Sequence, residues 1–390
     1  MNLVAGKGAG AWAVHNEALE ARAAGRDITF LTVGDPDQPP ARRVIDATIR
    51  ALRDGHTGYP PTLGYPEVRA AVAQRVERRT GQKCSAANVA IVPGTQAALF
   101  STVRCIIGEG DEVILPEPMY ATYEAVGRST GAHIVNVPLT SENRFHVDPE
   151  TVAQAITPRT RAIWINSPHN PTGAVMTGAE IAAIAELCVR NDLWLLSDEV
   201  YEDIAFARAH VSPWSLPGMA QRTIVVASLS KSHALPGFRM GWVVGPTCLM
   251  EHLSNVIVAM FYATSGFIQL GALEALKSDL PEVDALRRDY QRRAELVGRI
   301  LGDAPNCKFV PPEGGMFLLL DIRGLGLGSD EFARGLLHEK DVAVLPCDGL
   351  GPSVAGHLRI ALTTNDDRLA KAAKQIVDYA RELSSARPGS

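Results

Sequence analysis

The stretch SLSKSHALPGFRMG, Ser228–Gly241, is the most informative part of the sequence. It places one lysine, Lys231, among small hydroxyl residues and glycines, with Arg239 eight positions later. The preceding residues, Thr223–Ala227, are apolar and β-branched, which predicts a buried strand. Lys231 should therefore lie just beyond a strand end, where a fall of its pKa from about 10.4 would make the amine a nucleophile. Taken alone, the stretch also fits a surface loop rich in serine and glycine.

Three further segments end predicted strands with polar residues. Asn170 opens the turn NPTG after the apolar run Arg161–Ile165, and Asp198 ends a second apolar run, with Tyr201 three residues later. A buried carboxylate such as Asp198 requires a cationic or hydrogen-bonding partner. The segment VAIVPGTQAA, Val89–Ala98, predicts a strand, a Gly-Thr turn and a helix whose free N–H groups suit a phosphate.

In order, spacing and strand context, these four segments resemble the aspartate aminotransferase superfamily, the fold type I pyridoxal phosphate enzymes of aminotransferase class I and II. The resemblance extends from about Val14 to about Leu369. It implies an α/β fold, with a mostly parallel seven-stranded sheet in a large domain and a smaller α+β domain. The expected limits are an N-terminal segment, 1–40, that belongs to the small domain, a large cofactor-binding domain, 41–280, and the rest of the small domain, 281–390.

The resemblance assigns catalytic roles to three residues. Lys231 would hold pyridoxal 5'-phosphate as a Schiff base and move the proton between the substrate Cα and C4′ of the cofactor. Asp198 would pair with the pyridinium nitrogen, while Tyr201 and Asn170 would donate to the phenolic oxygen. The structural alternatives are a strand-end cap for Asp198 and an ordinary half-buried tyrosine for Tyr201.

The same resemblance implies further cofactor-binding positions at the phosphate and over the ring. At the phosphate they are Gly94, Thr95, Gln96, Ser228, Ser230 and Arg239. Tyr120 matches the aromatic residue that stacks on the ring, and Tyr123 is the competing candidate. Tyr59 matches the tyrosine that reaches the phosphate of a neighbouring subunit, so the active site would need a homodimer.

Substrate recognition is expected to centre on Arg359. This residue lies in the alternating, strand-like run Gly356–Thr363 and matches the arginine that binds the substrate α-carboxylate in two-pronged fashion. Gly34 would bring its backbone close to the same carboxylate. Asn170 and Trp12 complete the expected substrate site, although core packing is an alternative for Trp12.

The reaction implied by this site is transamination between an amino acid and a 2-oxo acid in a ping-pong cycle. Two alternatives stay open: a different donor, of the aromatic, alanine or aspartate type, and a lyase of the aminocyclopropane carboxylate synthase or C–S lyase type. A DNA-binding regulator is disfavoured because the N-terminus shows no helix-turn-helix or basic region.

The amino-acid donor is predicted from the residue at position 96 and from the resemblance of two segments to one branch of the family. Some bacterial aspartate aminotransferases have a lysine where Gln96 stands, and without that cation a second carboxylate would be disfavoured. The Lys231 segment and the stretch Val33–Pro40 most resemble the arginine:pyruvate aminotransferase branch. Acidic residues that could bind a guanidinium group are Asp35, Asp37, Glu17 and Glu313.

Composition agrees with a metabolic enzyme in the cytoplasm. The chain has 390 residues, is 46% hydrophobic and has a formal net charge of only -5, so nucleic acid is not an expected partner. The six cysteines show no metal-ligand spacing and are expected to be reduced thiols. The uncharged run Ser254–Leu273 is expected to be buried helix and loop rather than a membrane span. Lys7 and Glu17 flank a stretch that lacks the apolar core of a signal peptide.

Overall fold

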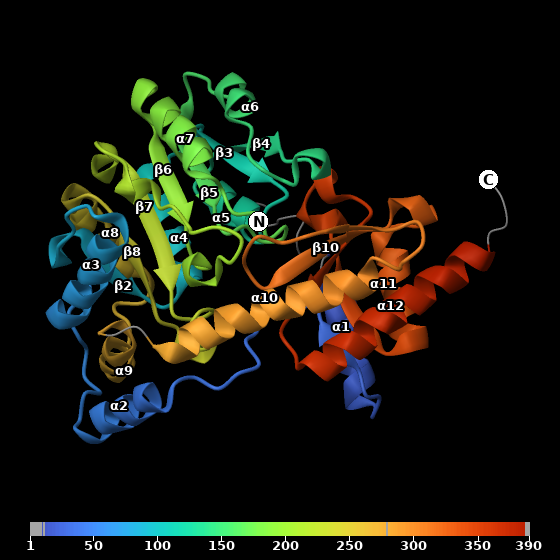
Figure 1. Ribbon diagram of the computed structural model, residues 1–390. Helices are drawn as coiled ribbons and strands as arrows, with labels where there is room; N and C mark the ends of the chain where they lie inside the picture. The colour runs from blue at the N-terminus through green and yellow to red at the C-terminus, as the bar shows by residue number, and fades with distance from the viewer. Residues whose placement is uncertain (1–9, 11, 278–279, 387–390) are drawn as a thin grey trace.

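Two β-sheets organise the chain, one in each lobe of the molecule (Figure 1). The computed structural model describes residue 10, residues 12–277 and residues 280–386. The segment around Lys7, where no signal peptide is expected, lies outside the described residues.

The larger sheet has seven strands in the order β2-β8-β7-β6-β5-β3-β4, which confirms the expected mostly parallel sheet. The pairs from β7 to β4 are parallel, and β8 runs antiparallel to both neighbours. Parallel strands put their carboxyl ends at one edge, where a ligand can meet residues from several strands. The strands are β2 (Val89–Val92), β3 (Glu112–Glu117), β4 (His133–Pro138), β5 (Thr160–Asn166), β6 (Trp194–Asp198), β7 (Thr223–Ser228) and β8 (Gly241–Val244).

Helices cover both faces of this sheet, as expected for parallel strands that are apolar along their length. One face packs against α4, α5 and α8, and the other against α3, α7 and α9. Helix α5 begins at Tyr123, which leaves Tyr120 in the irregular segment before it. The helices are α2 (Arg42–Arg53), α3 (Pro66–Thr80), α4 (Thr95–Ile106), α5 (Tyr123–Arg128), α6 (Pro149–Gln154), α7 (Gly178–Arg190), α8 (Thr247–Met260) and α9 (Gly266–Leu276).

The uncharged run Ser254–Leu273 is divided between α8 and α9 by the turn at 261–265. Both helices bury one side against the large lobe, in agreement with the expected helix and loop. In the described part of the chain, no helix is long and apolar enough to cross a membrane.

The smaller sheet has five strands in the order β1-β11-β12-β10-β9. Its first strand comes from the N-terminal segment and pairs with β11 in parallel, while the other pairs are antiparallel. The domain limits at 40 and 280 stay predictions. The elements are α1 (Ala13–Ala23), β1 (Thr29–Leu31), α10 (Pro281–Leu301), β9 (Lys308–Val310), β10 (Phe317–Asp321), α11 (Ser329–Lys340), β11 (Val342–Pro346), β12 (His357–Ala361) and α12 (Asp366–Ala386).

Strand β10 contacts both lobes, because its side chains point alternately to its two faces. Leu318 and Leu320 pack into the cluster that contains α10 and α12, whereas Leu319 packs into the cluster that contains Ile163 and Ile165 of β5. All of these side chains are almost fully buried. The loop before β10 is therefore held next to the carboxyl edge of the large sheet.

The start of β8 offers a test of how tightly the backbone packs beneath the cavity. A Cβ atom at Gly241 would lie 2.8 Å from the carbonyl oxygen of Ala227 and 2.9 Å from the backbone of Gly94. We expect Gly241→Ala to lower the free energy of unfolding by about 1–3 kcal/mol through overpacking. Gly237→Ala is the control, because a Cβ there meets nothing within 4 Å. Chemical denaturation of both variants without cofactor measures the difference, and equal stabilities would contradict the close packing.

Candidate active site

A cavity of about 200 Å³ lies where the carboxyl ends of β5, β6 and β7 face the small sheet. Almost all of the predicted site residues line it. They are Trp12, Gly34, Thr95, Gln96, Tyr120, Asn170, Asp198, Tyr201, Ser228, Ser230, Lys231, Arg239 and Arg359. Of the two predicted residues that do not line it, Gly94 lies directly beneath the Arg239 guanidinium group, and Tyr59 lies elsewhere.

Lys231 follows β7 and extends its amine across the cavity to the N-terminal segment. Its Nζ donates a hydrogen bond to the carbonyl oxygen of Gly34 at 2.6 Å. Burial lowers the pKa of this amine to about 8; the negative charge of Asp35 acts in the opposite direction, and the positive charges of Arg359 and Arg239 lower the pKa further. At pH 7 roughly a tenth of this amine is therefore in the neutral form that attacks an aldehyde, compared with less than about a thousandth at the ordinary pKa near 10.4.

Asp198 ends β6 as a buried carboxylate without a cation beside it in the described structure. Burial raises its pKa to about 6, and the hydrogen bond from the Tyr123 hydroxyl, 2.6 Å from Oδ2, acts in the opposite direction. The backbone N–H of Val200 donates to Oδ1 at 3.1 Å. Such a carboxylate lacks a positive partner, which a protonated pyridine nitrogen would supply.

Asn170 lies between the Tyr201 hydroxyl and the guanidinium group of Arg359. Its Oδ1 accepts a hydrogen bond of 2.9 Å from the guanidinium group of Arg359, and its Nδ2 lies 3.5 Å from the Tyr201 hydroxyl. Arg359 also donates to the carbonyl oxygen of Thr32 at 2.5 Å and stacks over Phe317, 4.0 Å from the ring centroid. Burial lowers the pKa of Arg359, but a guanidinium group in a protein stays charged near neutral pH.

The other end of the cavity is built to hold an anion. Helix α4 begins at Thr95 after Gly94, whose φ of 86° favours glycine. The Arg239 side chain lies against Gly94, so any Cβ there would displace it. Ser228 and Ser230 contribute hydroxyl groups from the end of β7 and the loop after it.

These residues fit the pyridoxal phosphate that the sequence implies. Thr95 Oγ1 and Arg359 Nε are buried and have no hydrogen-bond partner among the described residues. Buried donors are rarely left unpaired, so each indicates a missing ligand atom. A helix N-terminus with hydroxyl groups and Arg239 suits a phosphate, while Lys231 suits an aldehyde.

Tyr59 lies outside the cavity of its own chain. Its side chain is 85% exposed and contacts Tyr262, with ring centroids 4.7 Å apart. Val258 and Met260 of α8 are also exposed apolar side chains close to Tyr262 in the chain. An exposed aromatic pair of this kind is consistent with a role in another subunit's site.

Sequence reasoning missed three contributions to the site. Tyr123, considered only for ring stacking, donates to Asp198 and packs against Trp164, with centroids 4.4 Å apart. Asn166 ends β5, donates to the backbone of Asp198 and accepts from the Asn170 N–H. Phe317 supplies the surface under Arg359. A polar residue at the end of β5, four positions before Asn170, was the available signal for Asn166.

The four acidic candidates for guanidinium binding have different outcomes. Glu17 pairs with Arg334 and Asp37 pairs with Arg293, so neither carboxylate is free. The prediction for Glu313 is wrong, because its carboxylate is buried in contacts with arginines of the chain itself. Asp35 is exposed, follows Gly34 at the cavity and forms no ion pair within the described ranges.

Comparisons with known proteins agree with this geometry. Residues 26–376 match the family model for aminotransferase class I and II. The chain is 47% identical to the arginine–pyruvate transaminase of Pseudomonas aeruginosa over 97% of each chain. Among solved structures, a double mutant of Thermus thermophilus aspartate aminotransferase is 34% identical with a TM-score of 0.90, covering 94% of this chain and 95% of that one. The aromatic aminotransferase of Pyrococcus horikoshii is 31% identical with a TM-score of 0.89, covering 95% and 99%.

The contact between Tyr123 and Asp198 predicts a shift in the pH dependence of cofactor binding. Removing the hydroxyl in Tyr123→Phe should raise the Asp198 pKa further above about 6, because a hydrogen bond to the charged form is lost. As the pH is lowered, the Asp198 carboxylate of the variant would then be protonated sooner than that of the wild type. The affinity for pyridoxal phosphate should therefore begin to fall at a higher pH in the variant. Cofactor dissociation constants measured across pH test this. Tyr120→Phe is the control, and identical profiles for all three proteins would refute the role of the bond.

Proposed function

The chain belongs to the aminotransferase class I and II family and is a pyridoxal phosphate-dependent amino-acid aminotransferase, and from that premise we propose that it transfers the α-amino group of arginine to pyruvate. The main support is the similarity to the Pseudomonas aeruginosa arginine–pyruvate transaminase over nearly the whole of both chains. The aspartate and aspartate/prephenate aminotransferases among the relatives are more distant, at 30–35% identity.

The proposed roles follow from the chemistry of the cavity. Bound pyridoxal phosphate supplies a ring that accepts negative charge from the substrate Cα. Lys231 would remove the proton from Cα and deliver it to C4′ of the cofactor, which its lowered pKa favours. Asp198 would hold the pyridine nitrogen in its protonated form, and the hydroxyl of Tyr201 with Asn170 would donate to the phenolic oxygen.

The substrate carboxylate would bind Arg359. Its Nε is a buried donor without a partner in the described structure, and its side chain is held by Asn170 and Thr32. Because the guanidinium group is already fixed, little conformational entropy would be lost on binding. Trp12 and Gly34 would form the adjacent wall.

The charges around the cavity favour a cationic donor over a dicarboxylate. Within the described chain, the cations that line the cavity are Lys231, Arg239 and Arg359, and each already has a proposed partner. Gln96 accepts a hydrogen bond from Thr122 and provides no positive charge. The Asp35 carboxylate is exposed, acts electrostatically on Lys231 and would pair with a distal guanidinium group of the donor.

We propose a homodimer in which Tyr59 reaches the cofactor phosphate of the other subunit. The exposed Tyr59–Tyr262 pair supports this assignment. We further propose that the division at residues 40 and 280 separates the domains, since β1 pairs with the C-terminal strand β11. A cytoplasmic location is proposed from the thiols, all six of which are free.

The donor preference is tested by half-reactions in which each amino acid converts the cofactor to its pyridoxamine form. We expect arginine to react faster than aspartate or glutamate, by about 100-fold in rate over KM, because a second carboxylate would be desolvated without a partner. Pyruvate should then restore the starting form. Aspartate or glutamate as the fastest donor would overturn the specificity while leaving the family assignment intact. Release of ammonia from the amino acid would instead indicate a lyase.

Asp35→Asn provides the matched test of the acidic residue in the same assay. It should lower the rate over KM for arginine by roughly tenfold, the loss expected for one charge-assisted hydrogen bond, and leave alanine unaffected. Glu17→Gln, which alters a carboxylate already paired with Arg334, is the control. Equal losses for arginine and alanine would exclude a role in side-chain recognition.

A further inference from the structure

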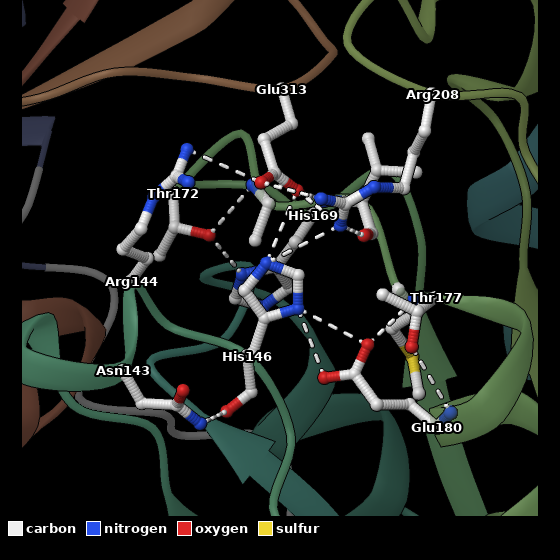
Figure 2. Close-up of polar contacts among 12 residues, drawn as sticks. Asn143, Arg144, His146, His169, Thr172, Thr177, Glu180, Arg208 and Glu313 are labelled. Atoms are coloured by element: carbon white, nitrogen blue, oxygen red, sulfur yellow. Dashed lines mark hydrogen bonds and ion pairs between the residues drawn. The ribbon is translucent and has the colours of Figure 1, made fainter.

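A second polar cluster, outside the cavity, surrounds Glu313 in the loop between β9 and β10 (Figure 2). The Glu313 side chain is only 4% exposed. Its two carboxylate oxygens accept from both terminal nitrogens of Arg208, at 2.9 and 3.1 Å, and Oε2 also accepts from the Val175 N–H at 3.1 Å. Arg208 donates in turn to the carbonyl oxygen of Val175 at 2.7 Å. The small lobe thus holds the backbone of the large lobe at Val175.

The backbone of the same loop binds the turn that begins at Asn170. The N–H groups of Glu313 and Gly314 both donate to the carbonyl oxygen of Gly173, at 2.8 and 2.9 Å. Gly173 has a φ of 75°, and a Cβ there would collide with Pro312. The loop and the turn are therefore fitted to each other at backbone contact distance.

The loop continues directly into the residues that support Arg359. Met316 and Phe317 pack so closely on Gly34 that a Cβ there would collide with both. Arg359 stacks on Phe317 and donates to Asn170. A shift of the loop would displace Asn170 on one side and the surface under Arg359 on the other.

His146 connects this loop to helix α7. Its Nε2 lies 3.2 Å from Glu313 Oε2, and its Nδ1 lies 2.9 Å from Glu180 Oε1. Glu180 also accepts from the Thr177 N–H in the capping box of α7. Only a protonated imidazole can donate to both carboxylates, since the neutral ring has a single N–H. A bridge between Glu180 and Glu313 therefore needs the charged form of His146, whereas the Nε2 of a neutral ring would accept from Arg208 at 3.5 Å.

Other charged groups face this histidine from each neighbouring segment. Arg144, in the loop before α6, pairs with Glu313 Oε1 at 3.2 Å, and Arg208 approaches His146 Nε2 at 3.5 Å. Within the cluster of Figure 2, two carboxylates and two guanidinium groups balance, so protonated His146 adds one positive charge. His169 is buried nearby and bonded to Thr172, and burial lowers its pKa to about 4, which keeps it neutral.

We propose that Glu313, bridged through protonated His146 to Glu180, is a positioning residue that holds the Asn170 turn and Arg359 in their binding geometry, so that substrate affinity falls when His146 loses its proton. This inference rests on the proposed carboxylate-binding role of Arg359, but it applies to any amino-acid donor. It places the pH sensitivity of substrate binding outside the residues that contact the substrate.

The direction of the effect follows from the histidine. The hydrogen bond to Glu180 and the negative charges of Glu180 and Glu313 raise the pKa of His146 above its ordinary value near 6.5, against the effect of burial. Because the pKa is raised in the folded state, the bridge stabilises the loop fully when the pH is below the ordinary histidine pKa near 6.5. The stabilisation is lost as the pH rises through the higher pKa of the folded protein.

Steady-state kinetics of the holoenzyme with its best donor test the proposal through KM and kcat separately. In the wild type, KM should rise with pH as His146 deprotonates. In His146→Gln, KM should be independent of this titration and roughly tenfold above the wild-type value at about pH 6, with kcat changed less than about twofold. Glu313→Gln should show the same loss of pH dependence. Glu112→Gln is the control, because this equally buried carboxylate pairs with Arg159 at the opposite, amino edge of the large sheet. It should keep the wild-type profile.

Hydrogen exchange without substrate separates this proposal from the proposed function. Amides of Val175, Glu313 and Gly314 should exchange faster in His146→Gln than in the wild type at low pH, with the rest of the large sheet unchanged. Faster exchange throughout the protein would mean a merely structural role and would overturn the proposal. So would a KM profile in either variant that follows the wild type. Local exchange together with an unresponsive KM would therefore overturn the positioning role of Glu313 without bearing on the role of Arg359 or on the donor, which the half-reactions test.

Discussion

A single buried guanidinium group, that of Arg359, holds the parts of this structure together. The side chain is only 2% exposed and cannot lose its charge, so its environment must supply acceptors. Those acceptors come from Asn170 at the edge of the large sheet and from Thr32 after β1, and the ring of Phe317 from β10 lies beneath. Three segments far apart in the chain therefore meet at one cation. The Nε that remains unpaired gives this cation a donor for a ligand.

Burial shifts the pKa values of two groups that line the cavity in opposite directions. It lowers the pKa of the Lys231 amine to about 8 and raises the pKa of the Asp198 carboxyl to about 6, because burial disfavours charge in both cases. Burial thus produces both a reactive amine at Lys231 and a carboxylate at Asp198 that lacks a cationic partner. Hydrogen bonds then adjust the result, as Tyr123 does for Asp198. The parallel strands place both groups at one edge of the sheet.

Much of this arrangement could be predicted from the sequence, because strand periodicity and the four motifs are local signals. The strands that lead to Asn170, Asp198 and Lys231 were expected and are present. Contacts between segments far apart in the chain could not be predicted from these local signals. Glu313 was one of four carboxylates considered for binding a guanidinium group, but it pairs with Arg208 and lies beside His146 through tertiary contacts that no spacing reveals. Tyr123 was misjudged for the same reason, since its partner lies 75 positions away.

The central claim is that the cofactor is attached to Lys231, the lysine whose amine reaches across the cavity to Gly34. Reduction of the holoenzyme with borohydride, followed by proteolysis and mass spectrometry, tests it most directly. We expect a pyridoxyl group on the peptide that contains Lys231, and loss of this label together with activity in Lys231→Ala. A label on any other lysine, or wild-type turnover in Lys231→Ala, would contradict it.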